Sequence, residues 1–126
     1  MRSFVSVLFV LMACGTDSAP DPDPDPDPDP DPTARECDDS YLDYGNFGAV
    51  FTADWCRGCH GAAVPEGMRQ HAPMGVDFDN LDAIRQWSER ITLRSTGATP
   101  TMPPAGGPSE EERALLAEWL RCGAPE

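Results

Sequence analysis

Six consecutive Asp-Pro pairs, from Asp21 to Pro32, determine how much of this 126-residue chain can fold. Proline removes an amide donor and fixes φ, and the segment has no apolar side chain to bury. Its aspartates also repel one another, so we expect a semi-rigid spacer of about 40 Å at roughly 3.1 Å per residue. We assign residues 14–36 to this tether, which leaves residues 37–126 for one small domain. A specific acidic binding tail is the alternative interpretation.

The first fourteen residues have the pattern of an export signal. A positive start at Arg2 precedes an apolar run from Phe4 to Leu11, broken only by Ser6. This run is too short to span a membrane as a mature helix and is typical of a signal peptide. The sequence Leu-Met-Ala-Cys ending at Cys14 resembles a bacterial lipobox, which implies removal of residues 1–13 and lipidation of Cys14. Ordinary signal cleavage nearby, with no role for Cys14, is the alternative.

The charge pattern limits the class of partner. The formal net charge is −13, and all nine basic residues are arginine. An acidic chain without a basic patch argues against nucleic acid and against anionic lipid surfaces. The acidic surface either serves solubility or meets a partner with a basic surface.

Hydrophobic spacing predicts two helices, over residues 44–59 and 80–94. Beyond the second helix, residues 97–107 are rich in Gly and Pro and are predicted as a loop, as are residues 64–76 between the two helices. The apolar face predicted for the first helix consists of Phe47, Val50, Phe51 and Trp55, and that of the second consists of Leu81, Ile84, Ser88 and Ile91, with Trp87 at its edge.

A third helix has clear start and stop signals. Ser109 is the expected N-cap, and Glu112 is its partner in a capping box. Gly123 is the residue expected to end the helix. No segment shows the alternation of a strand, so the predicted domain is all-α, with about three helices. The apolar stripe of the third helix is Leu115, Leu116, Trp119 and Leu120.

The pentapeptide Cys56-Arg57-Gly58-Cys59-His60 has the spacing of a c-type haem attachment site. Two cysteines three residues apart can reach the two vinyl groups of one porphyrin, and the next histidine can bind the iron. A thioredoxin-like dithiol would need βαβ units, which the pattern lacks. A zinc site would need a second Cys or His pair. Chance occurrence is the third alternative.

Met102, in Thr101-Met102-Pro103-Pro104, is the expected sixth ligand of the iron. Its thioether is a soft donor, and the two prolines stiffen the loop that presents it. The alternatives are a core-filling role for Met102, ligation by Met68, Met74 or His71, and an open or water-bound iron. Those three rivals follow His60 closely, so they reach the opposite haem face less readily.

These motifs together resemble the class I cytochrome c family over residues 44–123. Gly61 directly after the attachment motif, the Met-Pro-Pro sequence and the closing helix with Trp119 carry the resemblance. Gly48 lies eight residues before Cys56, where the family often has a glycine at a helix crossing. The aromatic residue that the family places four before the first haem cysteine is absent, because that position is Thr52 and Phe51 lies one residue earlier.

The resemblance implies a cytochrome c-like fold around one covalently bound haem c, held by Cys56, Cys59, His60 and Met102. In the family a haem propionate often contacts an arginine or a tryptophan. The candidates for that contact are Arg90, Arg94 and Trp87, and ordinary surface or core roles are the alternative.

Five cysteines minus one for lipid and two for haem leave Cys37 and Cys122. One precedes the first helix and the other ends the last, so a crossing of these helices would bring them close. A disulfide there would stabilise the domain by roughly 3–5 kcal/mol in the chain-entropy model. Two free thiols are the alternative, although disulfides persist in an exported protein.

The predicted function is one-electron transfer between membrane-associated or periplasmic redox partners, not enzymatic catalysis. An exported domain, anchored through Cys14 to a bacterial membrane and facing the periplasm or the cell surface, would suit it. The family's carriers often dock through lysines, which this chain lacks, so docking would use apolar contacts or acidic groups. The alternatives are a haem subunit of a larger oxidase or dehydrogenase, and an open-coordination haem enzyme or sensor.

Overall fold

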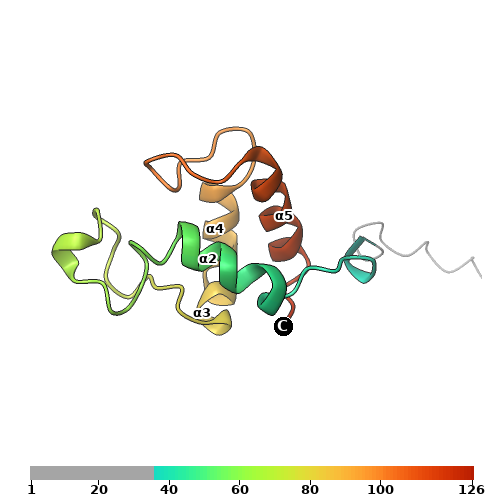
Figure 1. Cartoon of the computed structure of the whole chain (residues 1–126), viewed down its shortest axis with the longest axis horizontal. Coiled ribbons are helices and arrows are strands. Elements are labelled where there is room, and N and C mark those ends of the chain that lie inside the picture. The colour runs from blue at the N-terminus through green and yellow to red at the C-terminus, as the bar shows by residue number, and fades with distance from the viewer. Residues whose placement is uncertain (1–35) are drawn as a thin grey trace, which may run out of the picture.

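The computed structural model describes residues 36–126, which form helices and loops without a strand (Figure 1). The all-α prediction is therefore confirmed for this part of the chain. The predicted signal peptide, Cys14 and the Asp-Pro tether up to residue 35 lie outside the described residues. The elements are η1 (Tyr44–Gly48), α2 (Ala49–Trp55), η2 (Glu66–Met68), α3 (Leu81–Gln86), α4 (Ser88–Ser95) and α5 (Glu110–Arg121). Within the described residues no helix is long and apolar enough to cross a membrane.

The first predicted helix is present but ends earlier than expected. It consists of one π-helical segment, η1, continued by α2, and it stops at Trp55 instead of Cys59. The carbonyl of Thr52 accepts from the amides of both Cys56 and Arg57, at 3.0 and 2.9 Å, and the regular hydrogen bonding of the helix ends there. The haem-motif cysteines therefore lie in the turns after the helix. At the start, Asp43 and Asn46 form a capping box that the sequence analysis missed.

The second predicted helix is divided into α3 and α4. Asn80 caps α3 by accepting from the amide of Ala83 at 3.0 Å. At Trp87 the backbone leaves the helical region, with φ −104° and ψ 8°, and its amide is shared between the carbonyls of Ala83 and Ile84. The prediction of one continuous helix was wrong, because the apolar spacing continues across Trp87 although the backbone is no longer helical there.

The third helix, α5, has the predicted ends. The Ser109 hydroxyl accepts from the Glu112 amide at 3.1 Å, and the Glu112 carboxylate accepts from the Ser109 amide at 2.7 Å. After Arg121 the chain turns at Gly123, whose φ of 81° is a left-handed conformation that favours glycine. Short-range capping chemistry thus determines both ends of this helix.

The core lies where η1 and α2 cross α5, and it also includes side chains from α3 and α4 (Figure 1). Gly48 lies directly against the fully buried ring of Trp119, where a Cβ would come within 2.4 Å of two ring atoms. Val50 was wrongly placed in the apolar face, since its side chain is 56% exposed. The buried face of this helix includes Gly48 and Thr52, so its centre is rotated away from Val50. The buried core comprises Leu42, Phe51, Phe78, Leu81, Ile84, Ile91, Leu116, Trp119, Leu120 and Ala124.

The same crossing brings Cys37 and Cys122 together. Their sulfur atoms lie 2.03 Å apart, the distance of a disulfide bond, with 5.3 Å between the Cα atoms. The two residues are separated by 85 positions, so the bond closes nearly the whole domain into one loop.

Candidate cofactor site

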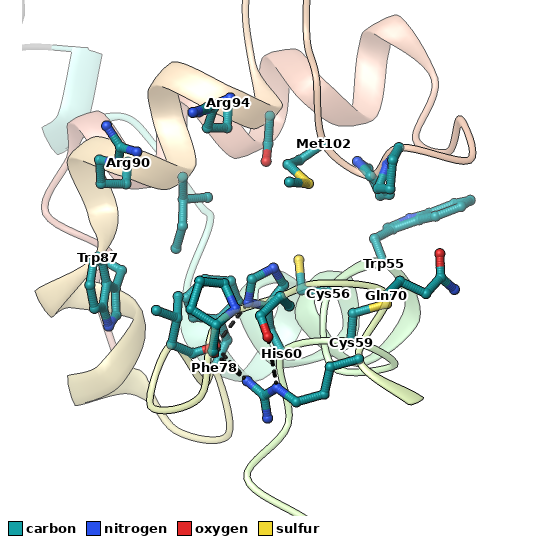
Figure 2. Close-up of a pocket in the computed structure, with 18 of the residues that line it drawn as sticks. Trp55, Cys56, Cys59, His60, Gln70, Phe78, Trp87, Arg90, Arg94 and Met102 are labelled. Atoms are coloured by element: carbon teal, nitrogen blue, oxygen red, sulfur yellow. Dashed lines mark hydrogen bonds between the residues drawn. The ribbon is translucent and has the colours of Figure 1, made fainter. Parts of the chain in front are cut away.

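A cavity of about 530 Å³ lies between α2, α4 and the two segments that were predicted as loops, residues 64–76 and 97–107. This volume is within the range of small-molecule and cofactor sites. Phe51, Phe78 and Ile91 contribute apolar surface from the core side. Trp55 lies across the cavity from Trp87, and Arg90 and Arg94 extend from α4 at its edge (Figure 2).

Cys56 and Cys59 both line the cavity as half-buried free thiols. Tight turns after α2 position them, since the carbonyl of Cys56 accepts from the amides of Cys59 and His60 at 3.1 and 2.8 Å. Burial raises the pKa of the Cys56 thiol to about 12. Redox-active dithiols depend on a lowered thiol pKa, so this environment disfavours the thioredoxin-like interpretation.

His60 lines the cavity in an orientation suited to a metal ligand. Its Nδ1 lies 2.8 Å from the carbonyl oxygen of Val76. Because a carbonyl can only accept, Nδ1 is the donor in this bond, and Nε2 is the nitrogen left to bind a metal. The ring also stacks on Phe78, with centroids 4.7 Å apart and an interplanar angle of 20°. These two contacts determine the tautomer and the ring plane.

Met102 approaches the cavity from the side opposite Cys56 and His60 (Figure 2). Its side chain is 36% exposed. Its backbone is held at both ends, since its amide donates to the carbonyl of Arg94 at 2.9 Å and its carbonyl accepts from Arg113 at 2.9 Å. The loop therefore has a defined position although it contains no regular secondary structure.

The rival ligands are placed less favourably. Met68 and Met74 are 69% and 61% exposed, and neither lines the cavity. His71 lines the cavity, but it belongs to the same loop that positions His60 and has a left-handed backbone with φ 71°. Among the methionines of the described residues, Met102 is thus the one that faces the cavity.

Other sequence expectations have different outcomes at the site. The three candidates for propionate contacts, Trp87, Arg90 and Arg94, all line the cavity. Gly61 is required sterically, because a Cβ there would lie 2.8 Å from the carbonyl oxygen of Arg57. Within residues 36–126, no group of three or more His, Cys, Asp or Glu side chains is placed to hold a metal ion.

Two arginines at the site were missed by the sequence analysis. Arg69 is fully buried at the cavity wall, and Arg113 reaches from α5 to the Met102 loop. The available signal for Arg69 was its position as the only arginine in a loop rich in Gly and Pro, residues 61–76. Such a loop has few backbone partners of its own for its carbonyl groups.

Comparison of the chain with protein-family models, with curated proteins and with solved structures gives no match. We therefore infer the function from the cavity and from the chemistry of the residues that line it.

Proposed function

We propose that this protein is a one-electron carrier with one haem c bound covalently in the cavity. In this proposal Cys56 and Cys59 would form the thioether bonds to the haem, and His60 and Met102 would bind its iron. The supporting observation is that four residues of the right chemistry line one cavity of about 530 Å³. Met102 is 42 positions beyond His60 in the chain, so their meeting at one cavity does not follow from sequence proximity.

The donor set fits the chemistry of the group. Haem iron, when bound, supplies a one-electron redox couple whose potential depends on its axial ligands. His60 would provide Nε2, since Nδ1 is engaged with Val76. The thioether of Met102 would provide the second donor. With both positions filled, no coordination site remains for a substrate, which favours electron transfer over catalysis.

The wall of the cavity is suited to a largely apolar ring with acidic substituents. Aromatic and aliphatic side chains from α2, α4 and the Phe78 segment would exclude water from the bound group. The charged groups that line the cavity are Arg69, Arg90 and Arg94, and no Asp or Glu of the described residues is among them. Arg90 and Arg94 are exposed one turn apart on α4, so we propose that they pair with the haem propionates.

The N-terminal region indicates where the proposed carrier would be located. We propose that lipidated Cys14 anchors the chain to a bacterial membrane after export, and that the Asp-Pro segment spaces the domain from the lipid. The domain could then reach redox partners in the periplasm or at the cell surface. Labelling with a radioactive fatty acid would test the anchor, since Cys14→Ala should abolish incorporation.

The central proposal is tested by the absorption spectrum of the full chain produced in bacteria that attach c-type haem. We expect colour that survives acid-acetone extraction, sharp low-spin bands after reduction, and a weak long-wavelength sulfur-to-iron band after oxidation. Met102→Ala should remove that band and leave the haem attached. Met74→Ala is the matched control, because this methionine is exposed and outside the cavity.

Two results would contradict parts of the proposal. Retained haem with a high-spin spectrum in the wild-type protein would support an open-coordination haem enzyme or sensor instead of a carrier. A colourless folded protein from haem-attaching cells would refute the haem site itself.

A further inference from the structure

Arg69 is the most completely bonded side chain at the cavity wall, and none of its surface is exposed. Its guanidinium donates to four backbone carbonyls and to one carboxylate. The longest of these contacts is 3.2 Å and the shortest, to Asp77, is 2.6 Å. The carbonyl partners are those of Gly61, Ala72, Pro73 and Val76. One side chain therefore connects both ends of the loop that follows His60.

One of these carbonyls is shared with the predicted iron ligand. The oxygen of Val76 accepts from Arg69 at 3.2 Å and lies 2.8 Å from Nδ1 of His60. Figure 2 shows these hydrogen bonds as dashed lines below His60 and Phe78. The orientation of the imidazole thus depends on a carbonyl that Arg69 also binds.

The loop needs such an external constraint. Gln70 and His71, directly after Arg69, have left-handed backbones with φ of 50° and 71°. Side chains with a Cβ avoid this region, and the conformation persists where surrounding contacts enforce it. The bonds of Arg69 to Ala72 and Pro73 span this strained turn.

The guanidinium also places charge close to the site. Its ion pair with Asp77 is uneven, because the Arg69 side chain is fully buried whereas that of Asp77 is 22% exposed. Water screens the carboxylate better than the guanidinium, so the positive charge dominates toward the cavity. A cation bonded to the Val76 oxygen also makes that oxygen a weaker acceptor for His60 Nδ1–H, which reduces electron donation from the imidazole to the iron.

We propose that Arg69 is a positioning residue for His60 and raises the reduction potential of the bound haem. The inference rests on the proposed function. Both effects have the same sign, because a ferric haem is more positive than a ferrous one and is destabilised by a nearby cation and by a weaker imidazole donor. Arg69 acts through Val76 and through its charge, without binding the iron.

The test is the reduction potential of the holoprotein, measured by spectroelectrochemical titration in wild type and variants. We expect Arg69→Gln to lower the potential and Asp77→Asn to raise it. Arg69→Lys should give a potential between wild type and Arg69→Gln, since it keeps the charge and loses the planar fork. Arg85→Gln is the matched control: Arg85 also binds backbone carbonyls, those of Gly123 and Ala124, but does not line the cavity.

A second measurement reports on positioning alone. Hydrogen exchange of residues 61–78 in the holoprotein should become faster in both Arg69 variants and stay unchanged in Arg85→Gln. Wild-type exchange in Arg69→Lys would refute the positioning role, and a wild-type potential in Arg69→Gln would refute the electrostatic one. If Arg69→Gln does not accumulate, an unchanged or lowered potential in Asp77→Asn overturns the inference. Wild-type protein without haem overturns the proposed function as well, whereas haem-loaded proteins of equal potential overturn this inference only.

Discussion

The contact between Gly48 and Trp119 allows a quantitative prediction for Gly48→Ala. Gly48 is helical, with φ −59° and ψ −44°, so alanine can adopt the same backbone conformation without strain. The new Cβ would, however, lie 2.4 Å from Cη2 and Cζ2 of Trp119. No real Cβ tolerates that distance, and the indole ring is 0% exposed. The helices must therefore separate or the ring must leave its position.

The expected loss of stability is the difference between two opposing effects. Overpacking a well-packed core costs about 1–3 kcal/mol, and the rigid, enclosed ring places this site near 3 kcal/mol. Replacing glycine by alanine in a helix returns roughly 0.5–1 kcal/mol. We therefore expect a net destabilisation of about 2 kcal/mol. For a domain of this size, that corresponds to a fall in melting temperature of about 8–16 °C.

Far-UV circular dichroism of the holoprotein during thermal and denaturant unfolding measures this loss. Gly67→Ala is the control, because a Cβ at Gly67 would meet no atom within 4 Å. Trp119→Phe removes the atoms that clash, so Gly48→Ala should cost much less in that background, as a double-mutant cycle would show. An equal cost of Gly48→Ala in both backgrounds would refute the steric explanation.

Three further predictions concern other contacts. Replacing Cys37 and Cys122 by alanine should lower the free energy of unfolding by about 4–5 kcal/mol in the chain-entropy model, measured by denaturant unfolding against the same protein with the disulfide intact. The hydrogen bonds between Glu112 and Ser109 at the α5 N-cap lower the pKa of Glu112 from its usual 4.5, so the stability that this contact contributes above pH 4.5 should be lost as the pH falls through the lowered pKa. Glu112→Gln should remove this pH dependence, measured as the melting temperature during acid titration. Arg113→Gln should weaken the hold on Met102, so the sulfur-to-iron band should disappear at a lower temperature than in wild type.

Local chemistry explains why the last helix was predictable from the sequence. Ser109, Glu112 and Gly123 act within a few residues of one another, so their capping roles need no tertiary information. The stripe of that helix also matched, with Leu116, Trp119 and Leu120 buried. The all-α fold class was also predictable, because it depends on the local spacing of apolar residues.

The errors arose where local pattern and backbone geometry diverge. The apolar spacing continued through Trp87, but the backbone there leaves the helix. The first helix was extended over Cys56 and Cys59, although the carbonyl of Thr52 ends the ladder. Val50 was misplaced because Gly48, which has no side chain to mark an apolar face, helps define the buried side.

The residues of the candidate site also differ in whether the sequence predicts them. Cys56, Cys59, His60 and Met102 could be named because each has a distinctive chemistry and sequence context, and the structure brings all four to one cavity. Arg69 could not, because its partners are main-chain carbonyls, which every sequence contains. Only the three-dimensional path of the loop shows which carbonyls converge on one guanidinium.

Arg69 and Arg113 both bind carbonyl groups of the loops that carry the candidate ligands. Both ligand loops are irregular, so their carbonyl groups lack the partners that regular structure provides. Arg69 satisfies carbonyls behind His60, and Arg113 does the same behind Met102, with contacts to the carbonyls of Ser95, Met102 and Pro108.

A guanidinium can do this because its five donors lie in one rigid plane, whereas an ammonium has three donors on a flexible stem. Lysine at either position would therefore keep the charge and lose most of the carbonyl bonds. We therefore expect Arg69→Lys to loosen the loop behind His60 and Arg113→Lys to loosen the loop behind Met102, each without affecting the other. Hydrogen exchange in the two loops would show this separation, and equal loosening of both loops by either variant would contradict it.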